Sequence, residues 1–206
     1  MGKQVILYAH GNASFLAEAQ PFKQMAVAAH WDVISVGYRG YPGSDGKPSE
    51  AGLAMDIRAA YRFVVETMGV PPARIVLHGR SLGGGVVGTL IDEVEIGGLV
   101  LESTFTSAVD LAAEIYWFVP VRALMINRFQ TLERASNFDG PVIIFHSVDD
   151  EVIPVAHGRR LHAGISHSQY VEVSELGHNM QVLDWHSEAR RVYISFLDEV
   201  QRNAER

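Results

Sequence analysis

The feature that most constrains the fold of this chain is an apolar run that passes through Gly79-Arg80-Ser81-Leu82-Gly83 into a glycine-rich segment. The preceding residues, Ile75-Val76-Leu77-His78, have the character of a buried strand, and the residues after Ser81 can start a helix. Such a sharp reversal from strand to helix forces Ser81 into a strained conformation, and small residues at 79 and 83 prevent clashes at the turn. The pattern therefore predicts a Ser81 hydroxyl at the rim of the sheet, with the N–H of Leu82 placed to stabilise an oxyanion.

A serine hydroxyl becomes a good nucleophile only when a base takes its proton and a carboxylate orients that base. Both partners follow in the sequence. The apolar strand Pro141–His146 runs into Asp150, and a short strand at Tyr170–Val173 is followed by His178. Residues that bind ligands collect at the carboxyl ends of parallel strands. We therefore expect an acid and a histidine at the same sheet edge as Ser81.

A third element lies upstream of this serine. Val5–Ala9 reads as a strand and is followed by His10-Gly11-Asn12-Ala13. An enzyme with this kind of serine turn needs a second oxyanion N–H from the loop after such a strand. The backbone amide of Asn12 is our candidate donor.

Four sequence blocks occur in a recognisable order. They are His10–Ala13, Tyr38–Ser44 with Gly46 and Pro48-Ser49-Glu50, Gly79–Gly84, and Asp150–Pro154. With these blocks the chain resembles α/β-hydrolases from His10 to His178, and within that superfamily it resembles small esterases, lysophospholipases and protein depalmitoylases. The resemblance implies Ser81 as nucleophile, Asp150 as orienting acid, His178 as base, and the backbone N–H groups of Asn12 and Leu82 as the oxyanion hole.

The fold class that follows is α/β, with a mostly parallel sheet covered by helices on both faces and a small helical cap. Residues 1–206 are expected to form a single domain. Family members usually carry further strands before the His-Gly strand, so we expect a sheet without the usual first strands. Ser147 also departs from the family, which more often has Gly there, and we expect only a small local change.

Two amphipathic helices are expected to pack on this sheet. The first is capped by Ser49 and is ended by Gly69 and Pro71. The second carries an apolar stripe from Val182 to Val200 and should pack beside the His178 loop.

The segment 105–129 is the expected cap. It contains Ile115-Tyr116-Trp117-Phe118-Val119-Pro120 and Leu124-Met125-Ile126. A run this apolar could be packed core, could line an acyl pocket or could touch a membrane surface. We favour an acyl pocket, which predicts rates that rise with acyl length to a medium chain. The candidate pocket residues are Phe105, Tyr116, Trp117, Phe118 and Met180.

Composition excludes several classes of function. The 206 residues are 48% hydrophobic, which suits one domain with a sizeable core. A net charge of −7, without a run of Lys or Arg, argues against nucleic-acid binding. The chain has no cysteine, so thiolate metal sites are excluded, and no histidine cluster suggests another metal site. No segment reaches the length needed to span a bilayer, and we expect a cytoplasmic protein without a cofactor.

Several residues have more than one interpretation. Glu102 could replace Asp150 as the acid, because some members of the superfamily place it after the preceding strand. Asp149 is expected to be a solvated neighbour, and His186, inside the last helix, is the only rival base. Gly83–Gly88 matches G-x-G-x-x-G, but its first glycine falls inside the expected helix, which argues against dinucleotide binding.

These observations predict a serine hydrolase that cleaves carboxylic esters or thioesters of small or acyl-chain substrates through an acyl-enzyme. Two other classes stay open at this point. One is a noncatalytic or partner-dependent protein with a hydrolase fold, and the other is an aminopeptidase-like amide hydrolase. The oligomeric state cannot be predicted from the sequence.

Overall fold

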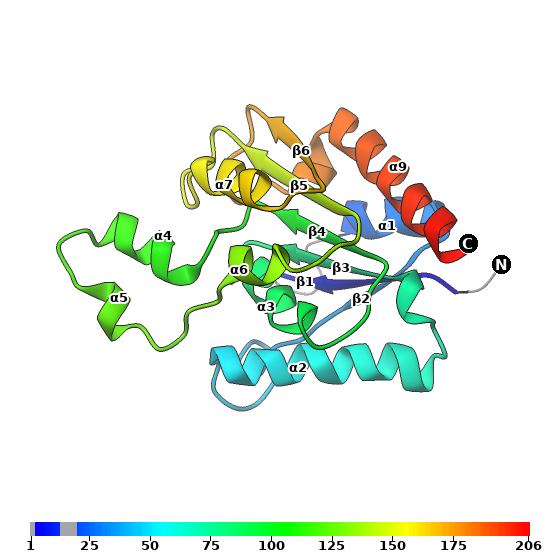
Figure 1. Cartoon of the computed structure of the whole chain (residues 1–206), viewed down its shortest axis with the longest axis horizontal. Helices are drawn as coiled ribbons and strands as arrows, with labels where there is room; N and C mark the ends of the chain where they lie inside the picture. The colour runs from blue at the N-terminus through cyan, green and yellow to red at the C-terminus, as the bar shows by residue number, and fades with distance from the viewer. Residues whose placement is uncertain (1–2, 13–19) are drawn as a thin grey trace.

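The structure, a computed structural model, describes residues 3–12 and 20–206. Ala13, the last residue of the His10 block, lies outside these described residues. The centre of the molecule is a six-stranded sheet with the order β2-β1-β3-β4-β5-β6, in which all neighbouring strands are parallel (Figure 1). The strands are β1 (Val5–Ala9), β2 (Asp32–Ser35), β3 (Ile75–Arg80), β4 (Gly98–Glu102), β5 (Val142–Ser147) and β6 (Ser168–Val173).

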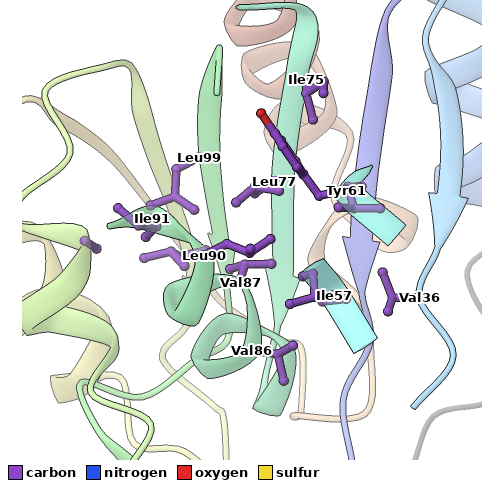
Figure 2. Close-up of a cluster of buried hydrophobic side chains, with 14 of the residues drawn as sticks. Val36, Ile57, Tyr61, Ile75, Leu77, Val86, Val87, Leu90, Ile91 and Leu99 are labelled. Carbon is purple, nitrogen blue, oxygen red and sulfur yellow. The ribbon is translucent and has the colours of Figure 1, made fainter. Parts of the chain in front are cut away.

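The four central strands are fully buried because helices cover both faces of the sheet. Alternate side chains along each strand enter two different cores. Leu7, Leu77 and Leu101 face the core under α2 (Glu50–Arg62) and α3 (Leu82–Ile91), part of which Figure 2 shows. Tyr8, Val76, Val100 and Phe145 face the opposite core, under α1 (Gln20–Ala28), α8 (Val182–Trp185) and α9 (Ser187–Ala204). The predicted parallel sheet with helices on both faces is therefore confirmed.

The helix α2 begins where its sequence predicts. The Ser49 side chain accepts a hydrogen bond from the Gly52 N–H at 3.1 Å, which caps the helix. After Arg62 the chain continues as a π-helical turn, Phe63–Thr67, before Gly69 adopts φ 70°.

The sequence suggested one helix for the stripe from Val182 to Val200, but the structure has two. The chain is extended at His186, with φ −104° and ψ 107°, which separates α8 from α9. The His186 side chain accepts from the Ala189 N–H at 3.2 Å and so caps α9. His186 is therefore an N-cap rather than an interior helical residue, because its imidazole satisfies a backbone donor that would otherwise lack a partner.

The connection between β4 and β5 contains α4 (Ala108–Ile115), α5 (Val121–Leu124) and α6 (Thr131–Ala135). The part that carries α4 and α5 extends away from the body of the molecule, whereas α6 lies against α3 (Figure 1). The remaining helix, α7 (Ala156–Gly164), connects β5 to β6. Across residues 3–12 and 20–206, no helix is both long and apolar enough to cross a bilayer.

Candidate active site

Ser81 lies at the turn between β3 and α3, in a conformation that L-residues rarely adopt. Its φ is 53° and its ψ is −120°. A backbone of this kind costs about 1–3 kcal/mol and persists only where its surroundings hold it. Here the Ser81 N–H donates to the Glu102 carbonyl at 2.9 Å, and the Thr104 hydroxyl donates to the Ser81 carbonyl at 2.6 Å. Both contacts come from the end of the neighbouring strand β4, which therefore holds the turn.

The turn is possible because α3 approaches β1 and β3 more closely than any side chain would permit. A Cβ added to Gly83 would lie 1.9 Å from the Ala9 carbonyl oxygen, and one added to Gly79 would lie 2.4 Å from the Gly83 carbonyl oxygen. Real Cβ contacts are never this short. The glycines at 79 and 83 are therefore required by the close packing of backbone against backbone.

Three side chains from separate strand ends meet at this turn. The Ser81 hydroxyl lies 3.0 Å from His178 Nε2, and His178 Nδ1 lies 2.9 and 2.8 Å from the two Asp150 oxygens. With the ring proton on Nδ1, the imidazole donates to Asp150 and accepts from Ser81. The three residues follow β3, β5 and β6, whose carboxyl ends lie at one edge of the sheet.

Asp150 is held in its ionised form. Burial raises the pKa of this carboxyl, but hydrogen bonds from His178 and from the Ile153 N–H, the latter at 2.7 Å, outweigh burial, so the net pKa is lowered. The Val152 N–H also donates to the same oxygen at 3.0 Å. An ionised Asp150 favours the Nδ1–H tautomer of His178 and would stabilise an imidazolium.

The loop that carries His178 is held at several points that the sequence did not single out. Arg80, the residue before the serine, donates from its guanidinium to the His178 carbonyl. Glu151, the residue after the acid, accepts the His178 N–H at 2.8 Å. These contacts tie the loop to the other two strand ends. The only sequence signal for these supports was that Arg80 lies next to Ser81 and Glu151 next to Asp150.

Glu102 holds the far end of the same loop. One carboxylate oxygen accepts the Val182 N–H at 2.8 Å, and the other lies 3.1 Å from His78 Nε2. Burial raises the pKa of Glu102, but its hydrogen bond and charge interaction with His78 and the charge of Arg80 lower it by more. Asp150, and not Glu102, is the carboxylate in contact with His178.

Asp149 and His146, which precede the acid in the sequence, have structural partners of their own. Asp149 accepts the Glu175 N–H at 2.7 Å and so supports the chain just after β6. His146 is buried, and its Nε2 lies 2.8 Å from the Ile153 carbonyl oxygen. Burial lowers the pKa of His146, which favours the neutral ring. No group of three or more potential metal ligands occurs among the residues that the structure describes.

Two tyrosines support the loop after β1. The Tyr38 hydroxyl donates to the His10 carbonyl at 3.0 Å, and the two rings stack with centroids 4.3 Å apart. The Tyr41 hydroxyl donates to the Asn12 side chain. Tyr38 and Tyr41 belong to the second sequence block, so this contact gives that block a structural role: it positions the loop that carries the Asn12 amide.

Sequence comparison finds curated relatives, although no protein-family profile matches the chain. An uncharacterized protein of Mycobacterium tuberculosis is 36% identical over 178 residues, which are 84% of this chain and 62% of that protein. Alpha/beta hydrolase domain-containing protein 17C of Xenopus tropicalis is 32% identical over 158 residues, or 76% and 49% of the two chains. The human protein 17B is 30% identical over 164 residues, or 77% and 54%. The chain belongs to the α/β-hydrolase superfamily. It spans about half to three fifths of these relatives.

Solved structures of this superfamily share the fold of the chain. An esterase from Exiguobacterium antarcticum superimposes with a TM-score of 0.72 at 18% identity, covering 96% of this chain and 93% of that one. The Pyrococcus furiosus esterase Pf2001 gives 0.77 at 18% identity, covering 96% and 83%. A puromycin-hydrolyzing peptidase of Mycobacterium tuberculosis gives 0.79 at 16% identity, covering 97% and 34%. The α/β-hydrolase architecture is thus common to esterases and a peptidase.

In this α/β-hydrolase, a pocket of about 220 Å³ is lined by both candidate oxyanion residues, Asn12 and Leu82. Its wall is mostly apolar and includes Tyr41, Leu53 and Phe129. The sequence did not single out these residues as pocket-forming.

The predicted pocket residues lie elsewhere in the structure. Phe105 is buried and packs against Gly85 of α3. Tyr116, Trp117 and Phe118 are exposed, Trp117 by 82%, in the segment from Ile115 to Ile126, which we call the arm. Met180 is exposed in the loop after His178. None of the five lines the pocket beside Leu82, so their role in substrate binding stays a prediction.

Proposed function

We propose that this chain is a serine hydrolase that cleaves carboxylic ester or thioester bonds of small or acyl-chain substrates. The observation that carries the proposal is the contact series from Ser81 through His178 to Asp150, at 3.0 and 2.8 Å. A strained serine in contact with an oriented imidazole is the arrangement that acyl transfer requires.

The proposed reaction has two steps. His178 Nε2 takes the proton of Ser81 as its hydroxyl oxygen attacks the carbonyl carbon, and the negative charge develops on the carbonyl oxygen. The N–H groups of Leu82 and Asn12 would stabilise that charge. His178 then gives the proton to the departing alkoxide or thiolate, which leaves an acyl group on Ser81. His178 then deprotonates a water molecule, which attacks the acyl carbon, and His178 returns this proton to the departing Ser81 oxygen, which releases the carboxylic acid and the free serine.

The apolar pocket beside Leu82 supports an acyl group as the part of the substrate that it receives. Amide cleavage uses the same steps with a poorer leaving group. We therefore expect 4-nitrophenyl esters to react much faster than the matching 4-nitroanilides.

The first test is covalent labelling with a fluorophosphonate. Wild type should label, and Ser81→Ala and His178→Ala should not, because one lacks the nucleophile and the other its base. Ser44→Ala is the matched control, since Ser44 is an exposed serine in the Tyr38–Ser44 loop, and it should label like wild type. Ester turnover should fall by several orders of magnitude in both active-site variants.

Absence of labelling in wild type with a native circular dichroism spectrum would contradict the proposal. A noncatalytic or partner-dependent role would then become the leading interpretation. Equal labelling of wild type and Ser81→Ala would show that another nucleophile reacts.

A further inference from the structure

A second pocket lies next to the one beside Leu82 and has no part in the proposed chemistry. Its volume is about 410 Å³, and the exposed surface of its wall is mostly apolar, although the charged residues Glu93 and Arg134 line it together with Ala51, Ala54, Thr89 and Ile126. Ile126 is 88% exposed although it is fully apolar. An apolar guest in this outer pocket would cover surface that is now in contact with water.

The two pockets share three wall residues, Ser49, Glu50 and Asn127. They are therefore neighbouring chambers with a common partition. One side of the partition is the first turn of α2, and the other is the chain between α5 and α6. These two segments lie on the same side of the molecule, next to the arm (Figure 1).

Reciprocal hydrogen bonds hold the partition together. The Glu50 N–H donates to the Asn127 side-chain oxygen at 2.9 Å, and the Arg128 N–H donates to the Glu50 carboxylate at 2.6 Å. The partners are 77 and 78 residues apart in the sequence, so the contact is tertiary and not part of one element. We call Glu50, Asn127 and the Arg128 N–H the latch.

Both hydrogen bonds of the latch lie in contact with solvent. Water can replace either partner, so each bond contributes little net stability and its loss should not unfold the protein. The latch thus separates, by weak contacts, an inner pocket lined by Leu82, the residue after Ser81, from an outer pocket lined by the exposed Ile126.

We propose that the latch divides an acyl-binding channel into an inner and an outer subsite and so sets the longest acyl chain that the enzyme accepts. This inference rests on the proposed function, because it assumes that the inner pocket receives the acyl group. The inner pocket alone, at about 220 Å³, is below the range of about 300–1,000 Å³ typical of ligand sites. With the latch closed the inner subsite takes a short chain, and with the latch open a longer chain reaches Ala54 and Ile126.

The test compares 4-nitrophenyl esters from acetate to laurate on wild type, Glu50→Ala and Asn127→Ala. Each variant removes one hydrogen bond of the latch. The ratio of kcat/KM for decanoate to that for butyrate should rise on the order of tenfold in both, because about two further methylenes become buried. Glu50→Gln keeps an acceptor for the Arg128 N–H and should keep the wild-type ratio.

A filling variant tests the outer subsite directly. Ala54→Phe, added to Glu50→Ala, places a ring in the outer pocket and should return the decanoate-to-butyrate ratio to the wild-type value. A ratio that is unchanged in both Glu50→Ala and Asn127→Ala would overturn the proposal. A ratio that rises in Glu50→Gln as much as in Glu50→Ala would also overturn it, because the hydrogen bond would then not matter.

A binding measurement separates this inference from the proposed function. In a Ser81→Ala background, which cannot turn over, calorimetry measures the affinity for sodium decanoate and sodium butyrate. Glu50→Ala should raise the ratio of decanoate affinity to butyrate affinity on the order of tenfold. If wild type neither labels nor hydrolyses esters, the proposed function fails. If the ratio of decanoate affinity to butyrate affinity does not rise, the inference about the latch is wrong, whatever the outcome of the kinetic assays.

Discussion

At the scale of single residues, Glu102, which holds the end of the His178 loop, disfavours the negative charge of a neighbouring carboxylate, Asp184. This half-buried carboxylate lies in α8, two residues after the Val182 N–H that Glu102 accepts. Burial and the negative charge of Glu102 raise the pKa of Asp184 to about 6. One of its oxygens is buried without a hydrogen-bond partner within the described part of the chain. Its ionised form is therefore disfavoured in the folded protein.

The raised pKa gives Asp184 a definite pH dependence. Below the unfolded pKa of about 3.9 the group is neutral in both states and costs nothing. As pH rises through the folded pKa of about 6, the folded state must ionise it and stability is lost. Asp184→Asn should therefore raise the free energy of unfolding by about 1–2 kcal/mol at pH 8, allowing for partial solvent screening, and by almost nothing at pH 4.

Urea denaturation at the two pH values measures this difference. Asp198→Asn, an exposed position on α9, is the matched control and should have little effect at either pH. An equal effect of Asp184→Asn at pH 4 and pH 8 would contradict the electrostatic explanation.

Residue chemistry also shows what the sequence could and could not predict. The order serine, acid, histidine predicts which side chains share one sheet edge, because parallel strands place their carboxyl ends together. The supports could not be predicted in the same way. Arg80, Glu151 and Glu102 reach from strand ends or a loop to a loop that is distant in the sequence, and no local pattern specifies which loop a side chain will reach.

At the scale of elements, the strands were predictable because their residues are apolar on both faces. The break between α8 and α9 was not, since the apolar stripe continues across His186 while the backbone becomes extended there. The pocket beside Leu82 was also missed. Its wall combines α2, the loop after β1 and the chain before α6, a combination that only the tertiary fold creates.

The packing of α3 predicts a sharp difference between two glycines of the same helix. Gly83→Ala should prevent stable folding or destroy the site, because the new Cβ would lie 1.9 Å from the Ala9 carbonyl oxygen, a backbone atom of a central strand. Gly88→Ala should instead stabilise the protein by about 0.5–1 kcal/mol, since the nearest atom, Thr131 Cα, is 3.6 Å away and alanine favours helix. Thermal unfolding of the two variants checks both signs. A Gly83→Ala protein with unchanged melting temperature would contradict the packing argument.

At the scale of the whole molecule, the projecting arm differs in charge from the rest of the chain. The chain carries a net charge of −7, yet the arm from Ile115 to Ile126 has one charged residue, Arg122, which pairs with Asp110 at 2.7 Å. Trp117, Phe118 and Ile126 are exposed there by 70–88%. Aromatic side chains of this kind favour the interface of a bilayer. We therefore expect transient contact of the arm with uncharged lipid surfaces.

Sedimentation with phosphatidylcholine vesicles measures this contact. Replacing both Trp117 and Phe118 with Ser should reduce the bound fraction several-fold, because each ring loses the burial that drives insertion. Trp185→Ser removes a tryptophan that is 66% exposed on α8, away from the arm, and should leave binding unchanged. Vesicles rich in phosphatidylserine should bind less protein, given the negative net charge. Equal binding by the wild type and the double variant would rule out the arm as the contact.

The tight seating of α3 on β1 also bears on how related chains diverge. Gly79 and Gly83 are demanded by backbone contacts that exist whether or not Ser81 reacts. A descendant that lost its nucleophile would still need both glycines in order to fold. Under the proposed function, the two glycines would be retained for architecture and the serine for chemistry. Among homologues, survival of the glycines identifies the scaffold, whereas only Ser81, Asp150 and His178 together record whether a lineage has kept the means to react.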